Sequence, residues 1–496
     1  MPCPPQAHPL STARDIPVST SARTKPIRPS SRCERIQPPK TTEVIMYLRV
    51  NPASHLKPVM SVPASKPETQ RAIVTATLAT GRSKIHNDLR CLETDTMKQA
   101  CRQLGAQISE HDGFLEIVGV GRNFTNDTLV IDAKGSGLVF RTLSAIACAR
   151  RAPTILTGDH TLRRRVMKPL FDALASLGAN IQHIGDHGKA PVINWGQRIS
   201  RTHAELPGDV SSQFVTALLF LAPLTDQPMT IHQSDPVLSK SYIAQTVDFL
   251  RKASIDVDVD ARFNHFSVSP GEYTAFDSHI NADYTSLSYL LFACTIFPGE
   301  YVIRGITSDT LQGEQIFIDV VKALGVKVMH DDTAKELLVS SVHARLSGKH
   351  EVDVSDGPNI IPTLVALSLF VEGEFRVVGG SVTRLHKSSR IESMVTEATK
   401  LGANIKLLWN QQGDIDGFVT HGRHDYEGGV YFTSCGDHRN FMSLFVASLK
   451  FRQPCHIDGY HDVICSFPEF LTQFEALGAE FAPVQRVVSG PAVIDE

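Results

Sequence analysis

The stretch Leu170–Ile181, LFDALASLGANI, has apolar residues at the spacing of one helical face, then Leu-Gly-Ala, then the start of a short apolar strand. Glycine most readily takes the left-handed conformation that ends a helix before the chain reverses. Five further stretches have this pattern, and the helix-ending positions recur at intervals of 71 to 77 residues. These stretches are Met97–Ile108, Thr246–Val257, Phe317–Val328, Met394–Ile405 and Phe470–Phe481, and Ser254 replaces the glycine in Thr246–Val257.

A second, more apolar helix is expected before each of these stretches. The predicted starts carry small, polar or proline residues, as helix N-termini do. Segments such as VTALLFLAPL have no polar face, which indicates burial on most sides. The predicted starts are Lys66, Gly137, Ser211, Asp283, Pro358 and Asp437. The sequence therefore predicts an α/β protein of six similar units, which group as three plus three into two domains.

The buried helices have a chemical consequence. If their N-termini point into a shared cleft, the positive ends of the helix dipoles converge on one volume. Such a cleft attracts anions without a large net charge on the protein. Polyanionic small molecules are the substrates that this arrangement favours.

The overall composition of the 496 residues favours a globular protein and no polyelectrolyte partner. Hydrophobic residues make up 42% and charged residues 20%, and the net charge is −3, so no global field favours nucleic acid or an anionic membrane. The apolar runs are too short to span a bilayer. Nine cysteines without a C-x-x-C pair indicate reduced thiols and predict a cytoplasmic protein without zinc.

Residues 1–45 differ from the rest of the chain. They contain nine prolines and five arginines and have no apolar periodicity. Such a segment cannot bury enough surface to offset its ordering entropy, and we expect a disordered N-terminal extension. Two other interpretations stay open: an organellar transit peptide, or an over-extended start with Met46 opening the folded chain.

Several short motifs lie at the predicted helix starts and in nearby loops. They are SKPETQR (Ser65–Arg71), GSGLVFRTL (Gly135–Leu143), LTGDHTLRRRV (Leu156–Val166), DVSSQFVTALL (Asp209–Leu219), SKSY (Ser239–Tyr242), LQGE (Leu311–Glu314), SSRIESM (Ser388–Met394) and GDHR (Gly436–Arg439). In this order they resemble the motifs of the enolpyruvyltransferase family, and most of all those of its EPSP synthase branch. The resemblance extends from Met46 to the C-terminus.

The resemblance implies a fold and a reaction. The fold is a two-domain inverse α/β barrel of six βαβαββ repeats around buried parallel helices, with residues 65–283 in one domain and residues 46–64 plus 284–496 in the other. The reaction transfers the enolpyruvyl group of phosphoenolpyruvate to a hydroxyl group of a phosphorylated acceptor. It needs no metal and no organic cofactor. We expect an open monomer whose domains close over these small-molecule substrates, with no nucleic-acid or membrane partner.

The resemblance also assigns a role to each matched position. The implied phosphoenolpyruvate-binding residues are Lys66, Arg165, Gln213, Arg390 and Arg439. The implied acceptor-binding residues are Arg71, Ser211, Ser212 and Ser239. The positions implied to carry the catalytic step are Lys66, Asn359, His386 and His438.

Departures from the family motifs concentrate where the reacting ring of the acceptor would lie. The family's catalytic aspartate falls on Asn359, which cannot ionise and so cannot take a proton from a hydroxyl group. Pro67 replaces a serine. The lysine and glutamate that precede the S-D-R-I motif fall on His386 and Lys387, and a late lysine falls on Cys465.

These departures leave the proton acceptor and the substrate open. Asp356, His386 or His438 could take the hydroxyl proton, and histidine is the natural base near neutral pH. Three functions are consistent with the sequence. The acceptor is shikimate 3-phosphate, or it is a nucleoside monophosphate of a specialised pathway, or the protein is a non-catalytic anion-binding paralogue.

Overall fold

The computed structural model describes residues 42–196 and 199–489, and residues Val44–Arg486 form one compact unit. Disorder was predicted for residues 1–45, and residues 1–41 of this segment lie outside the described residues. Strand β1 (Thr42–Val50) begins inside that segment and pairs with strand β25 from Tyr47 onward. Regular structure therefore begins at Thr42, so the expected disorder of residues 1–45 was wrong for residues 42–45.

The described residues contain six four-stranded sheets and one small two-stranded sheet, β3 (Ala79–Thr80) with β15 (Tyr273–Thr274). In one four-stranded sheet, β7 (Leu129–Asp132) runs parallel to β8 (Thr154–Thr157), and β10 (Val192–Asn194) and β9 (Ile181–His183) follow antiparallel. A parallel pair followed by antiparallel strands recurs in the other five. Their strand orders are β16 (Asp277–His279), β4 (Arg82–His86), β6 (Phe114–Val118), β5 (Gln107–His111); β11 (His203–Pro207), β12 (Met229–Ser234), β14 (His265–Val268), β13 (Val257–Val259); β2 (Val59–Ser61), β17 (Glu300–Arg304), β19 (Glu336–Ser340), β18 (Lys327–Asp331); β20 (Ser347–Asp353), β21 (Glu372–Val378), β23 (Ile415–His421), β22 (Asn404–Trp409); and β24 (Tyr431–Phe432), β25 (Cys455–Asp458), β1, β26 (Phe481–Ser489).

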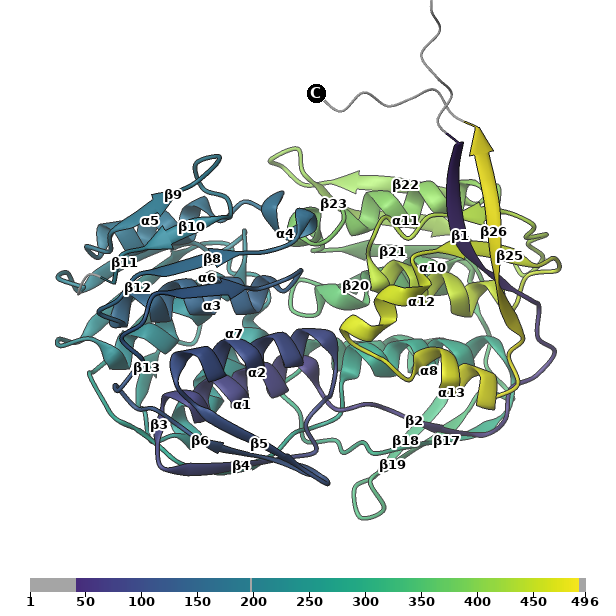
Figure 1. The fold of residues 1–496 in the computed structure, drawn as a ribbon. Helices are drawn as coiled ribbons and strands as arrows, with labels where there is room; N and C mark the ends of the chain where they lie inside the picture. The colour runs from purple at the N-terminus through teal and green to yellow at the C-terminus, as the bar shows by residue number, and fades with distance from the viewer. Residues whose placement is uncertain (1–41, 197–198, 490–496) are drawn as a thin grey trace, which may run out of the picture. The chain divides into compact units, whose positions relative to one another are not determined.

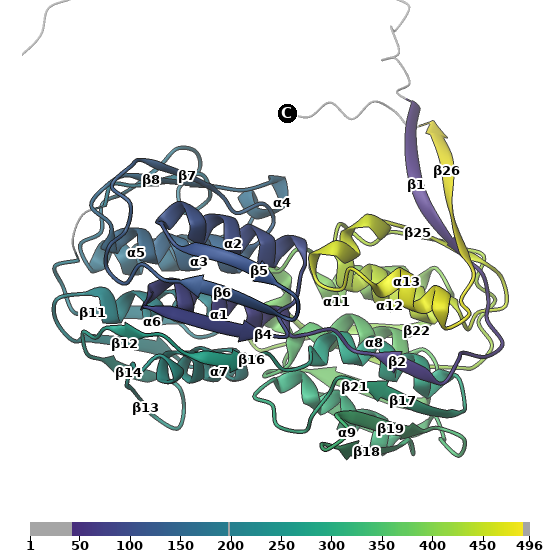
Figure 2. The same ribbon diagram turned by 60° about the horizontal axis from the view of Figure 1, so that its bottom comes forward.

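One helix of each repeat is almost wholly buried. Every residue of α8 (Tyr284–Ile296) is buried, as a sequence without charged residues or a strongly polar face predicts. The corresponding helices are α1 (Lys66–Leu78), α3 (Gly137–Ile146), α6 (Ser212–Leu221), α10 (Ile361–Ser368), which follows a short 3₁₀ turn, and α12 (His438–Ser448). Each begins within a few residues of its predicted start. Figures 1 and 2 show these helices surrounded by the sheets.

The second helix of each repeat is amphipathic and ends as predicted. Its members are α2 (Leu92–Leu104), α5 (Lys168–Ser176), α7 (Lys240–Lys252), α9 (Ile316–Ala323), α11 (Arg390–Thr399) and α13 (Phe470–Ala476), and a one-turn helix α4 (His160–Arg163) precedes α5. All six helix-ending residues have positive φ, from +61° at Ser254 to +114° at Gly105. The left-handed end is thus kept even where serine replaces glycine, at some cost in backbone energy.

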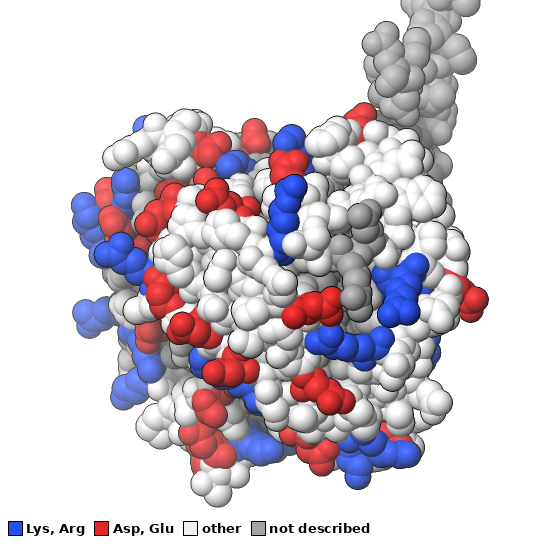
Figure 3. All heavy atoms as spheres, turned by 90° about the vertical axis from the view of Figure 1, so that its left-hand side faces the viewer, with Lys and Arg blue, Asp and Glu red and all other residues white. Residues whose placement is uncertain are grey.

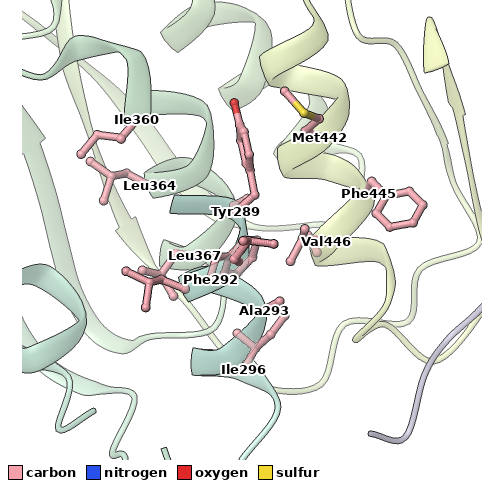
Figure 4. Packing of buried hydrophobic residues seen from close by; sticks show 14 of the residues in the cluster. Tyr289, Phe292, Ala293, Ile296, Ile360, Leu364, Leu367, Met442, Phe445 and Val446 are labelled. Carbon is pink, nitrogen blue, oxygen red and sulfur yellow. The ribbon is translucent and has the colours of Figure 1, made fainter. Parts of the chain in front are cut away.

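The buried apolar residues form two clusters. One cluster runs continuously along the chain from Ala64 to Ile280, and the other combines Leu48–Val62 with Ala282–Ala479. The two segments that join the clusters lie side by side and are bridged between Ala64 and Ala282. Figure 4 shows α8, α10 and α12 meeting in the second cluster.

Two surface observations complete the fold. Acidic and basic side chains are interspersed on the face shown in Figure 3. Within the described ranges, no helix is long and apolar enough to cross a membrane.

The α/β class with paired parallel strands is confirmed.

The packing predicts a stability effect at Phe445 on α12. Its ring is buried, with ring centroids 5.3 Å from those of both Phe470 and Phe474. Phe445→Ala should lower the free energy of unfolding by about 3–5 kcal/mol, because the cavity left behind adds to the lost burial. Urea titration measures this loss. Met329→Ala, at a side chain that is 65% exposed, should change it by less than about 0.5 kcal/mol, and equal losses would contradict the packing described.

Candidate active site

The N-terminal ends of five buried helices, α1, α3, α6, α10 with its preceding turn, and α12, contribute to the wall of one cavity. The starts of α2, α7 and α11 and the loops around residues 165 and 386 also contribute to it. Every candidate site residue from the sequence lies on this wall: Lys66, Arg71, Arg165, Ser211, Ser212, Gln213, Ser239, Asn359, His386, Arg390, His438 and Arg439. Side chains far apart in sequence are therefore brought together in one place.

A serine cap and a glycine shape two of the helix ends at the wall. Ser211 Oγ accepts the backbone N–H of Gln213 at 3.3 Å, which leaves its own hydroxyl hydrogen available to a ligand. Gly137 begins α3, and a Cβ atom there would lie 3.0 Å from Nη1 of Arg165. Glycine at this position therefore makes room for the guanidinium group.

Glu93 is buried between two lysines. Lys66 Nζ lies 3.0 Å from Glu93 Oε2, and Lys387 Nζ lies 3.3 Å from Glu93 Oε1. Burial opposes ionisation of Glu93, yet the two ammonium groups lower its pKa to about 2. Because Lys66 and Glu93 belong to the first group of repeats and Lys387 to the second, the wall is already connected across them. The expectation of an open site was wrong for these side chains.

The arginines are only partly neutralised. Arg390 Nε donates to Asp437 Oδ2 at 2.8 Å, and burial of Asp437 is outweighed by Arg390, which lowers the carboxyl pKa strongly. Nε and Nη2 of Arg165 are buried without a hydrogen-bond partner among the described residues. Burial, and then the charge of Arg165, lower the pKa of Arg141 to about 9. Unsatisfied buried donors of this kind indicate a site for an anion.

The two histidines are weak bases in this setting. Burial, and then the charge of Arg390, lower the pKa of His386 well below its usual range, while burial with Lys387 and Lys66 does the same at His438. Neither ring nitrogen of His438 has a hydrogen-bond partner among the described residues. Asp356 is occupied elsewhere, because its Oδ1 accepts the backbone N–H of Ser241 at the start of α7. Neither histidine is therefore a ready base, and Asp356 does not line the cavity.

Asn359 lies in a network that sequence motifs did not reveal. Its Oδ1 accepts from Arg390 Nη1 at 2.7 Å, and its Nδ2 donates to the hydroxyl of Tyr242 at 2.5 Å and to Glu314 Oε1 at 3.2 Å. Tyr242 in turn donates to Glu314 Oε1 at 2.5 Å. Glu314 belongs to the LQGE motif, which gave no sign of this contact.

Arg71 is also held by the protein. It donates from Nε to Thr246 Oγ1 at 2.9 Å and from Nη2 to the carbonyl of Tyr242 at 2.9 Å. Its guanidinium group has no carboxylate partner among the described residues, and burial lowers its pKa to about 10. It therefore keeps only part of its hydrogen-bonding capacity for a ligand.

An α/β fold whose helix ends and buried guanidinium groups surround one cavity defines a protein with a binding site for small anions. Comparison with known proteins agrees. Residues 50–474 match the family described as EPSP synthase (3-phosphoshikimate 1-carboxyvinyltransferase). The chain belongs to this family, and the enzyme class is carboxyvinyltransferase.

Individual relatives cover nearly the whole chain. The 3-phosphoshikimate 1-carboxyvinyltransferase of Methanosphaera stadtmanae is 30% identical over 445 residues, which cover 88% of this chain and 100% of that relative. The enzyme of the same name from Methanocaldococcus jannaschii is 32% identical over 437 residues, covering 88% and 99%. The solved EPSP synthase of Acinetobacter baumannii is 22% identical with a TM-score of 0.72, covering 89% of this chain and all of that one, which shows a shared fold.

The Glu93 cluster predicts a pH-dependent stability. Because the pKa of Glu93 is about 2 in the folded protein and about 4.3 in an unfolded chain, its ionised form stabilises the fold above about pH 4.3, and this contribution is lost as the pH falls towards 2. Glu93→Gln should therefore lower the free energy of unfolding by about 2–3 kcal/mol at pH 7. Urea titrations at several pH values should show the difference shrinking between pH 5 and 3.

The matched control for Glu93→Gln is Asp172→Asn. Asp172 pairs with Lys168 at 2.5 Å on the surface of α5, where both side chains are about half exposed. Its loss should cost less than about 1 kcal/mol. A loss at Glu93 that is as small as this, or that stays constant from pH 7 to 3, would contradict the assigned pKa.

Proposed function

We propose that this protein transfers the enolpyruvyl group of phosphoenolpyruvate to a hydroxyl group of a phosphorylated acceptor. The observation that carries the proposal is the excess of buried, unsatisfied cationic donors in a single cavity, above all Nε and Nη2 of Arg165. Phosphoenolpyruvate carries a carboxylate and a phosphate close together. Charge-assisted hydrogen bonds to such a dianion stabilise both it and the charge that develops on the departing phosphate.

We assign the phosphoenolpyruvate side of the cavity to Lys66, Arg165, Gln213, Arg390 and Arg439. A lysine that the family motif places at the position of Cys465 is missing here. Lys387 lines the cavity and interacts electrostatically with Cys465, which supports the idea that Lys387 supplies this cation instead. The number of cations around the phosphate is then maintained.

We assign the acceptor side to Ser211, Ser212 and Ser239, which would hold the phosphate of the acceptor, and to Arg71. Shikimate 3-phosphate is the first acceptor to test, because the relatives are named for it. A nucleoside monophosphate is the second. Asn359 bonded to Glu314, and Pro67 in place of a serine, favour a pocket altered on the side of the reacting ring.

The proposed reaction has two stages. The methylene carbon of phosphoenolpyruvate is protonated while the acceptor oxygen adds to the central carbon. Phosphate then leaves as the methylene proton is removed again. Lys66 lies at the wall with Glu93 as its partner, so proton exchange with the methylene carbon is assigned to the ammonium group of Lys66.

For the fold we propose the two-domain inverse α/β barrel, with residues 65–283 in one domain and residues 46–64 plus 284–496 in the other. The two separate hydrophobic clusters support this division. A monomer is proposed as the working form, because the cavity is built from one chain.

Anion binding is tested by comparing two neighbouring arginines. Arg165→Ala should weaken phosphoenolpyruvate binding by about 2–4 kcal/mol, because a charged oxygen loses its charge-assisted partner. Arg163 is exposed, and its Nε is bonded to the carbonyl of Gly158, so Arg163→Ala should cost less than about 0.5 kcal/mol. Calorimetry measures both, and equal losses would count against the assignment.

Catalysis is tested by release of inorganic phosphate from phosphoenolpyruvate. The wild-type protein should release phosphate with shikimate 3-phosphate or with one of a panel of nucleoside monophosphates, and at least 100-fold more slowly with shikimate or a nucleoside, which lack the phosphate for the serines. Ser211→Ala should raise the KM of the acceptor more than that of phosphoenolpyruvate. Binding of phosphoenolpyruvate without phosphate release from any acceptor would favour the non-catalytic alternative.

A further inference from the structure

The network of Asn359, Tyr242 and Glu314 has only one consistent pattern of hydrogens. A guanidinium group can only donate, so the atom of Asn359 that faces Arg390 must be the amide oxygen. The amide nitrogen then faces Glu314 and the Tyr242 oxygen. The phenol hydrogen of Tyr242 is directed at Glu314.

This pattern explains why an ionised aspartate is disfavoured at position 359. A carboxylate there would place an oxygen at the position of Nδ2, 3.2 Å from the carboxylate of Glu314. Two carboxylates so close in a buried site cannot both ionise. The negative charge at this end of the cavity is therefore carried by Glu314, one layer behind the wall, while Asn359 and Tyr242 form the wall itself.

We propose that Tyr242 is a catalytic residue and that Glu314 acts through it, so that the two form a proton relay for the acceptor hydroxyl. The inference rests on the proposed function. The oxygen of Tyr242 lies 2.5 Å from Asn359 Nδ2, next to the position where the family motif has its proton-accepting aspartate. Tyr242 and Asn359 both line the cavity at this position, whereas Glu314 does not.

The relay balances the protons of the addition. As the acceptor oxygen bonds to the central carbon of phosphoenolpyruvate, its hydrogen passes to the oxygen of Tyr242, and the phenol hydrogen passes to Glu314 Oε1. When the C–O bond to phosphate breaks, the bonding electrons leave with the phosphate. The relay runs in reverse and returns one proton, which ends on the released phosphate.

The surroundings of Glu314 suit this role. It is 1% exposed and faces Tyr242, Asn359, Arg439 and Asp283. Burial, with a smaller effect from Asp283, raises its pKa above the usual range for glutamate, so it holds a proton more readily than an exposed carboxylate. Burial and then Glu314 keep Tyr242 in the phenol form, which can pass a proton on.

The test uses steady-state phosphate release with the acceptor that the wild-type protein turns over. Glu314→Gln should lower kcat at least 100-fold and change phosphoenolpyruvate affinity, measured by calorimetry, less than threefold. Tyr242→Phe should lower kcat comparably, and Tyr242→Phe/Glu314→Gln should be no worse than either change alone, because the two residues act as one unit.

Moving the carboxylate from position 314 to position 359 distinguishes a proton relay from a purely structural role of Glu314. Asn359→Asp alone should not raise kcat, because Glu314 opposes its ionisation. Asn359→Asp/Glu314→Gln restores one carboxylate at the wall. Its kcat should be at least tenfold higher than that of Glu314→Gln. A structural role of Glu314 gives no reason for such a recovery.

The matched control is Glu68→Gln. Glu68 is another buried glutamate, bonded to Gln312 Nε2 at 2.8 Å and to the backbone N–H of Asn281, and it does not line the cavity. Its kcat should stay within threefold of wild type. Glu314→Gln with more than a third of wild-type kcat, or no recovery in the exchanged double variant, would overturn the relay alone. Absence of phosphate release by the wild-type protein would overturn the proposed function and the relay with it.

Discussion

Crowding of like charges in a closed space is the constraint on which this structure depends. Lys66, Arg165, Lys387 and Arg390 point at one small volume together with the positive ends of several helices. In an apolar interior such groups repel one another and lose hydration. Glu93 offsets the repulsion by pairing with Lys66 and Lys387. Arg390 at the start of α11 pairs with Asp437. The remaining imbalance is what a dianionic substrate would correct.

The sequence predicted most of the fold because its signals are local. A left-handed residue at the end of a helix depends on only a few neighbours, and Ser254 shows that the backbone requirement outlasts the glycine. The uncharged and largely apolar α8 could be placed in the core without knowing its partners. The beginning of β1 was missed because the strand lies in a sheet between β25 and β26, both of which come about 400 residues or more later in the chain.

The site was predictable only in part. Residues of the helix starts were found because short motifs place them there, and they do meet in one cavity. Glu93 and Glu314 escaped notice because an acidic residue in a first helical turn is commonplace, and only contacts across the fold give these two a role. The weakness of His386 as a base could not be foreseen either, since it arises from Arg390 and from burial.

The uneven division of the chain between its two apolar clusters determines the order in which they can be completed during synthesis. The cluster from Ala64 to Ile280 is continuous, so all its parts have been synthesised when little more than half of the chain has been made. The other cluster must hold Leu48–Val62 unpaired until strands such as β17 and β25 follow. An early apolar segment that waits for a late partner is exposed to aggregation, and the cell must keep it apart from its neighbours in the meantime.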